Sequence, residues 1–168
     1  NVGLWLGATP ETLLQISDAN FKTMSLAGTQ VANKDSESIS TEQINVVWKS
    51  KELEEQQLVT DFIEKQLASI SSNLKIDKTE TIRAGNLFHL RTKVEGELLE
   101  KADLKSLIRA LHPTPAVCGL PRNMARDFII KNENYNRNYY TGFLGELNLK
   151  KSDFEVQFTI IFTKKTVN

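Results

Sequence analysis

Hydrophobic residues near the end of the chain recur at every second position, which is the period of a β-strand. The run consists of Phe154, Val156, Phe158, Ile160 and Phe162 and predicts a half-buried strand. Shorter alternating runs predict strands at 4–6, 12–16, 21–26, 86–98 and 139–147. A turn is expected at Pro10, another at Asp18-Ala19-Asn20, and a polar loop over 32–44.

Two other stretches follow the period of a helix. Apolar residues recur at spacings of four and three over 50–71, at Val59, Ile63, Leu67 and Ile70. A second stripe lies in 104–111 and ends before Pro113, and Pro121 suits the first residue of a third helix to about Lys131. Strands outnumber helices and their connections are irregular. We therefore predict a single α+β domain over 1–168, with mainly antiparallel sheets flanked by helices.

Composition narrows the function classes. Lysine plus arginine equals aspartate plus glutamate at 21 each, so the net charge of zero argues against a nucleic-acid partner. The single cysteine excludes an internal disulfide framework and a multi-cysteine zinc site. No apolar run approaches the roughly 20 residues of a membrane span, and no signal peptide is visible. A cytoplasmic protein without a membrane partner is expected.

The first predicted helix carries acidic residues beside its apolar stripe. With Glu52 set at zero on a helical wheel, Glu55 falls near 300° and Glu54 near 200°, while Ile63 falls near 20°. Two interpretations remain open. The acids remain solvated at the helix start and are stabilised by the helix dipole, or they form a cation site, since Mg²⁺ takes one or two carboxylates and keeps several waters.

Other candidate residues are ambiguous taken one at a time. His89 lies within a predicted strand, where a histidine is more often an ordinary hydrogen-bonded polar residue, although an imidazole that faces a pocket would hydrogen-bond a ligand. His112 precedes Pro113 and would help end a helix. Gly119-Leu120-Pro121 opens a helix with free backbone N–H groups that attract anions, although an ordinary tight turn is the better explanation of this segment by itself. Gly28 ends a strand with the same ambiguity, and Glu11 is expected in a turn between strands.

Six segments together resemble the conserved motifs of chorismate-utilising enzymes, in the same order. They are Leu6–Leu14 (LGATPETLL), Ser25–Thr29 (SLAGT), Ser50–Val59 (SKELEEQQLV), His89–Thr92 (HLRT), Leu111–Arg122 (LHPTPAVCGLPR) and Glu133–Gly145. The segment His112-Pro113-Thr114-Pro115 is most similar to the sequence found in the isochorismate synthase branch of the family, and salicylate synthases are also similar to this chain. The resemblance covers residues 3 to about 147 and implies an incomplete chorismate-binding enzyme fold.

The resemblance also implies a reaction and a site. In that family, water adds at C2 of chorismate while the C4 hydroxyl leaves, and Mg²⁺ holds the substrate carboxylate. The resemblance implies that Glu11 is the general acid, and the pKa of such an acid must be raised towards the working pH. It also implies that Glu55 is a Mg²⁺ ligand, with Glu52 beside it. His89 becomes a hydrogen-bonding partner of the substrate. The remaining pocket residues it implies are Gly28, Thr29, Ala116 and Gly119. The implied partner is the small molecule chorismate, and no oligomeric state is specified.

The chain also departs from the family pattern. Gln56 stands where the family has a histidine after the metal-binding glutamate, and 146–168 lacks the expected arginine and the second metal-binding helix. The base lysine belongs to a strand upstream of residue 1. We therefore expect a portion of an isochorismate synthase, serving menaquinone or salicylate-type biosynthesis, that is inactive as this chain alone. The alternatives are a salicylate synthase of the same family, or a non-catalytic remnant that binds an acidic metabolite or a partner chain.

Overall fold

The structure is a computed structural model that describes residues 5–32, 46–134, 142–150 and 153–165. The strands of this part of the chain are β1 (Trp5–Ser17), β2 (Asn20–Val31), β3 (Ser71–Ile76), β4 (Glu80–Ala84), β5 (Leu87–Leu98), β6 (Gly142–Lys150) and β7 (Asp153–Lys165). The helices are α1 (Ser50–Leu67), α2 (Leu104–Leu111), α3 (Pro115–Cys118) and α4 (Arg122–Asn132).

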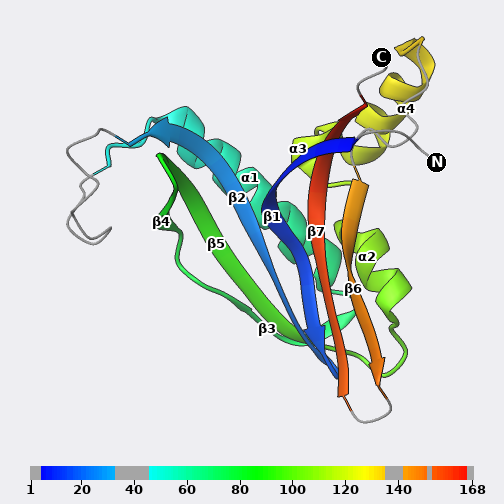
Figure 1. Ribbon diagram of the computed structural model, residues 1–168. Helices are drawn as coiled ribbons and strands as arrows, with labels where there is room; N and C mark the ends of the chain where they lie inside the picture. The colour runs from blue at the N-terminus through cyan, green and yellow to red at the C-terminus, as the bar shows by residue number, and fades with distance from the viewer. Residues whose placement is uncertain (1–4, 33–45, 135–141, 151–152, 166–168) are drawn as a thin grey trace.

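All the strand pairs are antiparallel, and together they form one sheet in the order β3-β5-β2-β1-β7-β6, with β4 pairing the upper part of β5 (Figure 1). The predicted α+β class with mainly antiparallel pairing is confirmed. None of the helices in the described part of the chain has the length and apolar character needed to cross a membrane.

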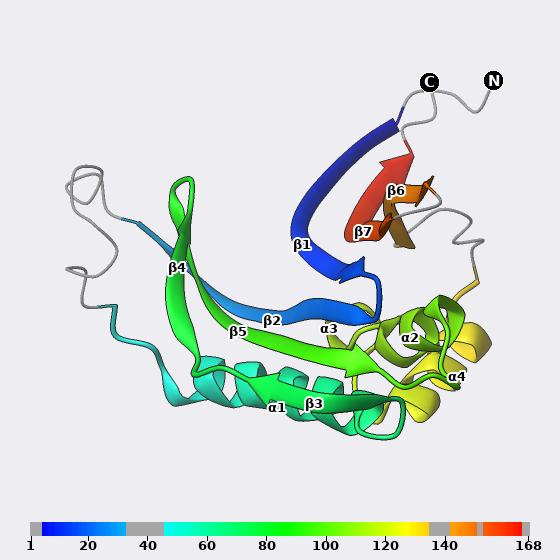
Figure 2. The same cartoon turned by 90° about the horizontal axis from the view of Figure 1, so that it is seen from below.

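The sheet opens into two arms that share a short hinge. β1 pairs with β2 only through Gln15–Ser17, next to the turn, whereas it pairs with β7 from Trp5 to Ser17. Beyond the hinge, β1 leaves β2 and forms one arm with β7 and β6, while β2, β5, β4 and β3 form the other (Figure 2). The turn predicted at Asp18-Ala19-Asn20 joins β1 to β2, and Asp18 adopts the left-handed conformation within it.

Helices cover one face of the β2–β5 arm, and the core lies between the two layers. α1 runs along this face, with α2, α3 and α4 towards its far end (Figure 2). The core consists of buried side chains from the sheet and from α1 and α2, among them Leu14, Ile16, Phe21, Val94, Ile63, Leu67, Leu107 and Leu111. The predicted apolar stripe of α1 is therefore the face that packs on the sheet.

The structure corrects several local predictions. The predicted turn at Pro10 is wrong, because β1 continues through it and the pairing with β7 shifts register between Ala8 and Glu11. Proline lacks an N–H and is tolerated at such an irregularity. Strands β3 and β4 and the short helix α3 were not predicted, and α4 begins at Arg122 with Pro121 as its N-cap. The predicted loop at 32–44 and residues 139–141 lie outside the described residues, apart from Ala32.

Candidate functional site

A β-bulge near the end of β2 brings three predicted substrate-binding residues together. The pairing of β2 with β5 shifts register between Ala27 and Thr29, so Gly28 is an extra residue there, with φ of 66°. Thr29 pairs with His89 of β5. Nδ1 of His89 lies 3.1 Å from the Gly28 carbonyl oxygen and 3.2 Å from Oγ1 of Thr29. We call Gly28, Thr29 and His89 the bulge cluster.

The hydrogen bonds of the bulge cluster fix the tautomer of its imidazole. A carbonyl oxygen only accepts, so Nδ1 of His89 carries the proton that it donates to Gly28. In the neutral ring, Nε2 is then an acceptor. The Thr29 hydroxyl accepts from the same Nδ1–H and keeps its own proton to donate. The cluster thus presents an acceptor next to a donor, a combination suited to a ligand that carries hydroxyl and carboxylate groups.

The indole of Trp48 covers Gly28. A Cβ atom on Gly28 would lie 3.1 Å from Cζ3 of Trp48 and 3.4 Å from Cδ1 of Leu90. The indole Nε1 donates a 2.8 Å hydrogen bond to Oγ1 of Thr81 in β4. Trp48 therefore links the segment before α1 to β2 and β4. Both this contact and the positive φ require glycine at position 28.

Glu52 closes the first turn of α1 and ties that turn to β2. Its Oε2 accepts a 2.8 Å hydrogen bond from the backbone N–H of Lys49 and a 3.1 Å hydrogen bond from Nε2 of Gln30. The positive end of the helix dipole also favours a carboxylate here. Gln30 follows Thr29 in β2, so Glu52 lies at the same end of the arm as the bulge cluster.

Glu55 remains in solvent. Its side chain is 50% exposed and forms a 3.6 Å ion pair with Lys51. This agrees with the solvated interpretation of the acidic first turns. An exposed pair of this kind contributes only about 0–1 kcal/mol, so the Glu55 carboxylate can exchange Lys51 for another cation at little cost.

Glu52 and Glu55 fit a loosely held divalent cation. They supply two carboxylates one helical turn apart, which is the number that Mg²⁺ commonly takes while it keeps several waters. Within the described ranges, no three His, Cys, Asp or Glu side chains gather closely enough to hold a metal ion. Further ligands would have to be waters, a substrate or groups from outside these ranges.

The side chain of His89 and the packed face of α1 lie on opposite faces of β5. Leu90, Thr92 and Val94 are buried, and Thr92 hydrogen-bonds to α1 through Gln56. Side chains alternate along a strand, so His89 faces the other side. None of the contacts given for the described residues joins Glu52 or Glu55 to His89, and a shared cavity around them stays a prediction.

Ala116 and Gly119 lie in the helix layer rather than at the bulge cluster. Ala116 is exposed on α3, which contacts α1 and α4. Gly119 ends α3 with φ of 90°, and its N–H donates to the Pro115 carbonyl at 2.7 Å. A Cβ on Gly119 would lie 3.5 Å from the Cβ of Ala125, which is an ordinary contact distance. Glycine is therefore favoured at position 119 by the positive φ and not by a lack of space. A pocket-lining role for these two residues stays a prediction.

Glu11 lies in the other arm of the sheet. The expectation that it occupies a turn between strands is wrong, because it pairs with Ile160 of β7 within β1. It follows the register shift at Pro10, and such irregularities re-aim side chains. The side chain of Glu11 lies outside what the structure describes, so its role as a general acid stays a prediction.

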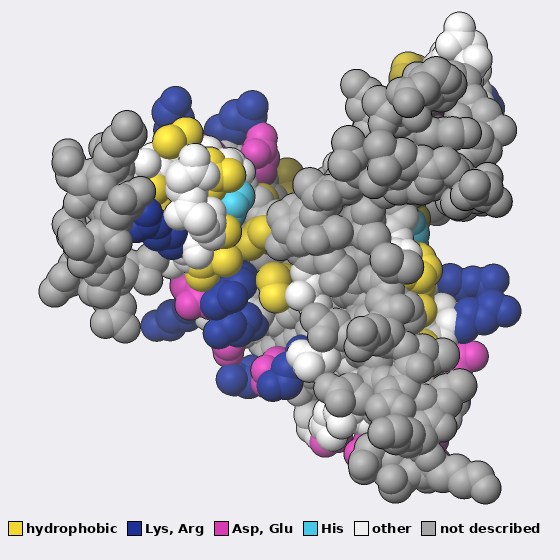
Figure 3. All heavy atoms as spheres, viewed as in Figure 1, with side chains coloured by type: hydrophobic (Ala, Val, Ile, Leu, Met, Phe, Trp, Pro, Cys, Tyr) yellow, Lys and Arg dark blue, Asp and Glu magenta, His cyan; other side chains and the backbone are white. Residues whose placement is uncertain are grey.

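The face that carries His89 is basic and partly hydrophobic. Arg91 lies two residues further along β5 and donates two hydrogen bonds to Oε1 of Glu80, one from Nε at 2.9 Å and one from a terminal nitrogen at 2.8 Å. The side-chain nitrogen of Lys93 lies 3.4 Å from the same oxygen. The hydrogen bond from Arg91, followed by the nearby charges, lowers the pKa of Glu80. Hydrophobic and basic side chains gather over this arm in the space-filling view (Figure 3). An anionic ligand would find favourable surroundings here.

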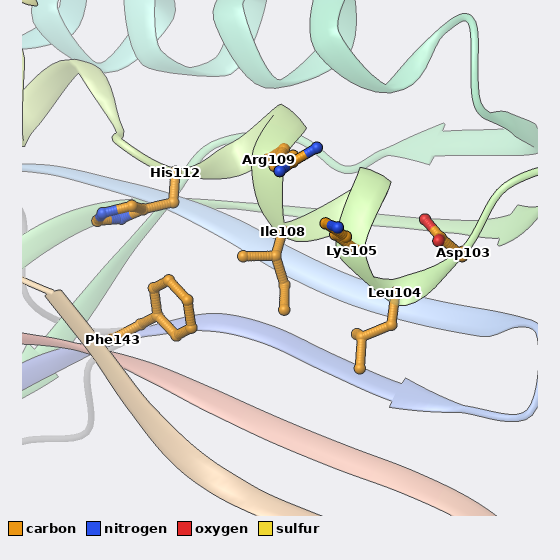
Figure 4. A pocket seen from close by; sticks show the side chains of 7 residues that line it. All are labelled: Asp103, Leu104, Lys105, Ile108, Arg109, His112 and Phe143. Atoms are coloured by element: carbon orange, nitrogen blue, oxygen red, sulfur yellow. The ribbon is translucent and has the colours of Figure 1, made fainter.

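A cavity of about 610 Å³ lies between α2 and β6, away from the predicted site residues. The apolar side chains of Leu104, Ile108 and Phe143 point into it, and charged groups of α2 lie around them (Figure 4). The ring of His112 meets that of Phe143 edge-on, with 5.2 Å between centroids. Burial, and secondarily Arg122, lowers the pKa of His112. His112 caps the end of α2, as the sequence indicated.

Two residues at the site were missed from the sequence, Trp48 and Gln30. Trp48 comes two residues before the start of α1, and Gln30 directly follows the Gly28-Thr29 pair. The signals available in the sequence were a large aromatic residue next to a predicted helix start and a glycine at the end of a predicted strand. Their mutual contact depends on how α1 docks on the sheet, which no local pattern encodes.

Comparison with known proteins identifies the family. Residues 2–158 match the family of chorismate binding enzymes, a match that extends into β7. The chain is 30% identical to isochorismate synthase MenF of Pasteurella multocida over 164 residues, covering 98% of this chain and 38% of that protein. It is 33% identical to isochorismate synthase MenF of Escherichia coli over 150 residues, covering 89% of this chain and 35% of that protein.

A solved structure shows the same fold. The menaquinone-specific isochorismate synthase MenF of Escherichia coli superimposes with a TM-score of 0.76 at 29% identity, covering 95% of this chain and 39% of that one. The chain belongs to the family of chorismate binding enzymes. It spans about two fifths of the length of these relatives.

Proposed function

We propose that this chain is a portion of a menaquinone-type isochorismate synthase and that the bulge cluster binds the substrate, chorismate. The observation that carries the proposal is the fixed geometry of His89, whose Nδ1 is held by Gly28 and Thr29. Nε2 of His89 and the hydroxyl of Thr29 would then hold a hydroxyl and a carboxylate of the substrate. The identities to isochorismate synthases of 30% and 33% support the same function.

The remaining predicted residues have distinct roles in the proposal. Glu11 would protonate the departing C4 hydroxyl as water adds at C2. Glu55, with Glu52 beside it, would hold Mg²⁺, which supplies positive charge to bind and orient the substrate carboxylate. Ala116 and Gly119 would give the pocket its shape. The basic face next to His89 supports the binding of an anion, because Arg91 and Lys93 share the single carboxylate of Glu80.

Binding and conversion are separate expectations for this chain. The resemblance to the family assigns the base lysine and further metal ligands to segments outside these 168 residues. We therefore expect the chain to bind chorismate without converting it. The metal would be recruited by the two carboxylates of α1, and its affinity would be low because two carboxylates are a small ligand set.

The test is a titration of the chain with chorismate, followed by NMR of backbone amides, together with an assay for isochorismate. We expect shifts centred on residues 28–29 and 89 and no isochorismate. His89→Asn removes the ring whose Nε2 would accept a hydrogen bond from the substrate hydroxyl, and loss of one hydrogen bond between neutral groups predicts roughly three- to tenfold weaker binding. His112→Asn is the matched control and should leave the affinity unchanged. Equal affinity of the wild type and His89→Asn, or an absence of binding, would refute the proposal.

A further inference from the structure

A cluster of buried polar side chains lies between α1 and the centre of the sheet. Its members are Gln56 and Thr60 of α1, Ser25 of β2 and Thr92 of β5, with exposures of 1%, 5%, 1% and 1%. Nε2 of Gln56 donates to Oγ of Ser25 at 2.8 Å, to Oγ1 of Thr92 at 2.9 Å and to the Ser25 carbonyl at 3.2 Å. One amide group therefore joins the helix to two adjacent strands.

The orientation of this amide is fixed by its partners. The Ser25 carbonyl only accepts hydrogen bonds, so turning the amide over would place Oε1 of Gln56 against another acceptor. Thr60, one turn further along α1, supports the arrangement through Oγ1, which lies 2.7 Å from Oγ of Ser25 and donates to the Gln56 carbonyl at 3.0 Å. Only one rotation of α1 about its axis satisfies all these bonds.

The cluster is a poor choice for stability alone. Among the described residues, Oε1 of Gln56 is buried and has no hydrogen-bond partner, and a buried acceptor left without a donor is unfavourable. A methionine would fill the same space without that penalty, since its side chain is of similar length, apolar and flexible. The gain from glutamine is directional: apolar contacts tolerate rotation and sliding of a helix, whereas the bonds of Gln56 do not.

The residues that this restraint holds most directly are the two carboxylates of α1. Glu55 is the neighbour of Gln56, and Glu52 lies four residues earlier, one turn along the same side of the helix. Glu52 also reaches β2, through its 3.1 Å hydrogen bond from Gln30. We propose that Gln56 is a positioning residue that holds the carboxylates of Glu52 and Glu55 in a fixed place on the sheet. Its relevance to metal binding rests on the proposed function.

The experiment compares Gln56→Met with Thr60→Val in the 168-residue chain. Gln56→Met removes all three bonds to the sheet, while Thr60→Val removes two bonds of the same cluster one turn further from the carboxylates. We expect Gln56→Met to retain the melting temperature within a few degrees and to lower the hydrogen-exchange protection of amides 53–56 about tenfold, because local opening follows the loss of local bonds. We expect Thr60→Val to leave that protection unchanged.

Binding of Mn²⁺ provides the readout for metal. Mn²⁺ broadens the signals of nearby amides, and in the wild type we expect this broadening to be centred on residues 52–55. In Gln56→Met the first turns of α1 are looser, so at the same Mn²⁺ concentration we expect the broadening to be about fivefold smaller. If Gln56→Met does not fold, Gln56→Asn, which keeps the amide but shortens its reach, should show the same two losses.

Equal effects of the Gln56 and Thr60 variants, or unchanged protection in Gln56→Met, would overturn the positioning role. Absence of Mn²⁺ broadening in the wild type would instead overturn the metal role in the proposed function. In that case the exchange comparison alone decides whether Gln56 positions the turn.

Discussion

Replacement of Gly28 by alanine tests the geometry of the bulge cluster. Gly28 has φ of 66°, a conformation that costs a residue with a Cβ about 1–2 kcal/mol. The new Cβ would also lie 3.1 Å from the ring of Trp48, so this half-buried ring must shift by a few tenths of an ångström. Overpacking of this kind adds about 1 kcal/mol. We expect Gly28→Ala to lower the free energy of unfolding by about 2–3 kcal/mol in total.

Gly85→Ala is a matched control for the backbone term. Gly85 has φ of 61°, and a Cβ there would meet nothing within 4 Å, so this variant should lose only about 1–2 kcal/mol. Urea unfolding of both variants, in the wild type and in a Trp48→Ala background, isolates the contact with the ring as a double-mutant cycle. In the Trp48→Ala background the two glycine substitutions should have equal effects. Equal effects already in the presence of Trp48 would refute the reasoning, because the steric contact would then contribute nothing.

Two further predictions concern the core. Burial lowers the pKa of His112, so the folded ring resists protonation. The stability associated with the neutral ring is fully present above the unfolded value of 6.5 and is lost as the pH falls from there through the lower pKa of the folded state. Urea unfolding at about pH 7.5 and about pH 5 should show this loss in the wild type and a smaller one in His112→Phe, and an identical pH dependence would contradict it. Gly96→Ala would bring a Cβ to 2.8 Å from Cζ of the buried Phe21, and it should lower the free energy of unfolding by about 1–3 kcal/mol. Adding Phe21→Leu to the Gly96→Ala chain should partly relieve this loss, because it removes the ring that the new Cβ contacts.

Elements with a strong local pattern were predictable from the sequence. The alternating residues from Phe154 form β7, and the apolar stripe through Ile63 and Leu67 forms the buried face of α1. The turn at Asp18 was also predictable, because aspartate tolerates the left-handed conformation that a tight hairpin requires. In each case the residues themselves carry the information.

Strands β3 and β4 could not be predicted because their sequences are polar. β3 begins Ser71-Ser72-Asn73, and it is a strand only through its pairing with β5. Pro10 was misjudged for a related reason: proline signals a turn in isolation, but β7 provides a partner strand on both sides of it. Tertiary pairing decided these segments.

The candidate site was predictable only in part. The sequence motifs indicated Gly28, Thr29 and His89, and the structure brings them together through a bulge. The helical wheel relates Glu52 and Glu55 to each other within α1, a helix that the structure confirms, but it contains no information on the strand face opposite the helix. Gln30, which holds Glu52, lies 22 positions away along the chain.

The hinge between the two arms has a consequence for how the chain acquires its structure. The outer half of β1 pairs with the opposite end of the chain: Gly7 is the partner of Thr163. During synthesis, the β2, α1 and β5 segments emerge long before β7 exists, so they can form their compact layer first. The backbone N–H and C=O groups of the outer half of β1 then lack their strand partner until β7 has been synthesised. Pairing of strands that are so far apart in the sequence is also slow. We expect nascent chains that end before β7 to aggregate through this strand, and a peptide of the β7 sequence supplied in trans to suppress that aggregation.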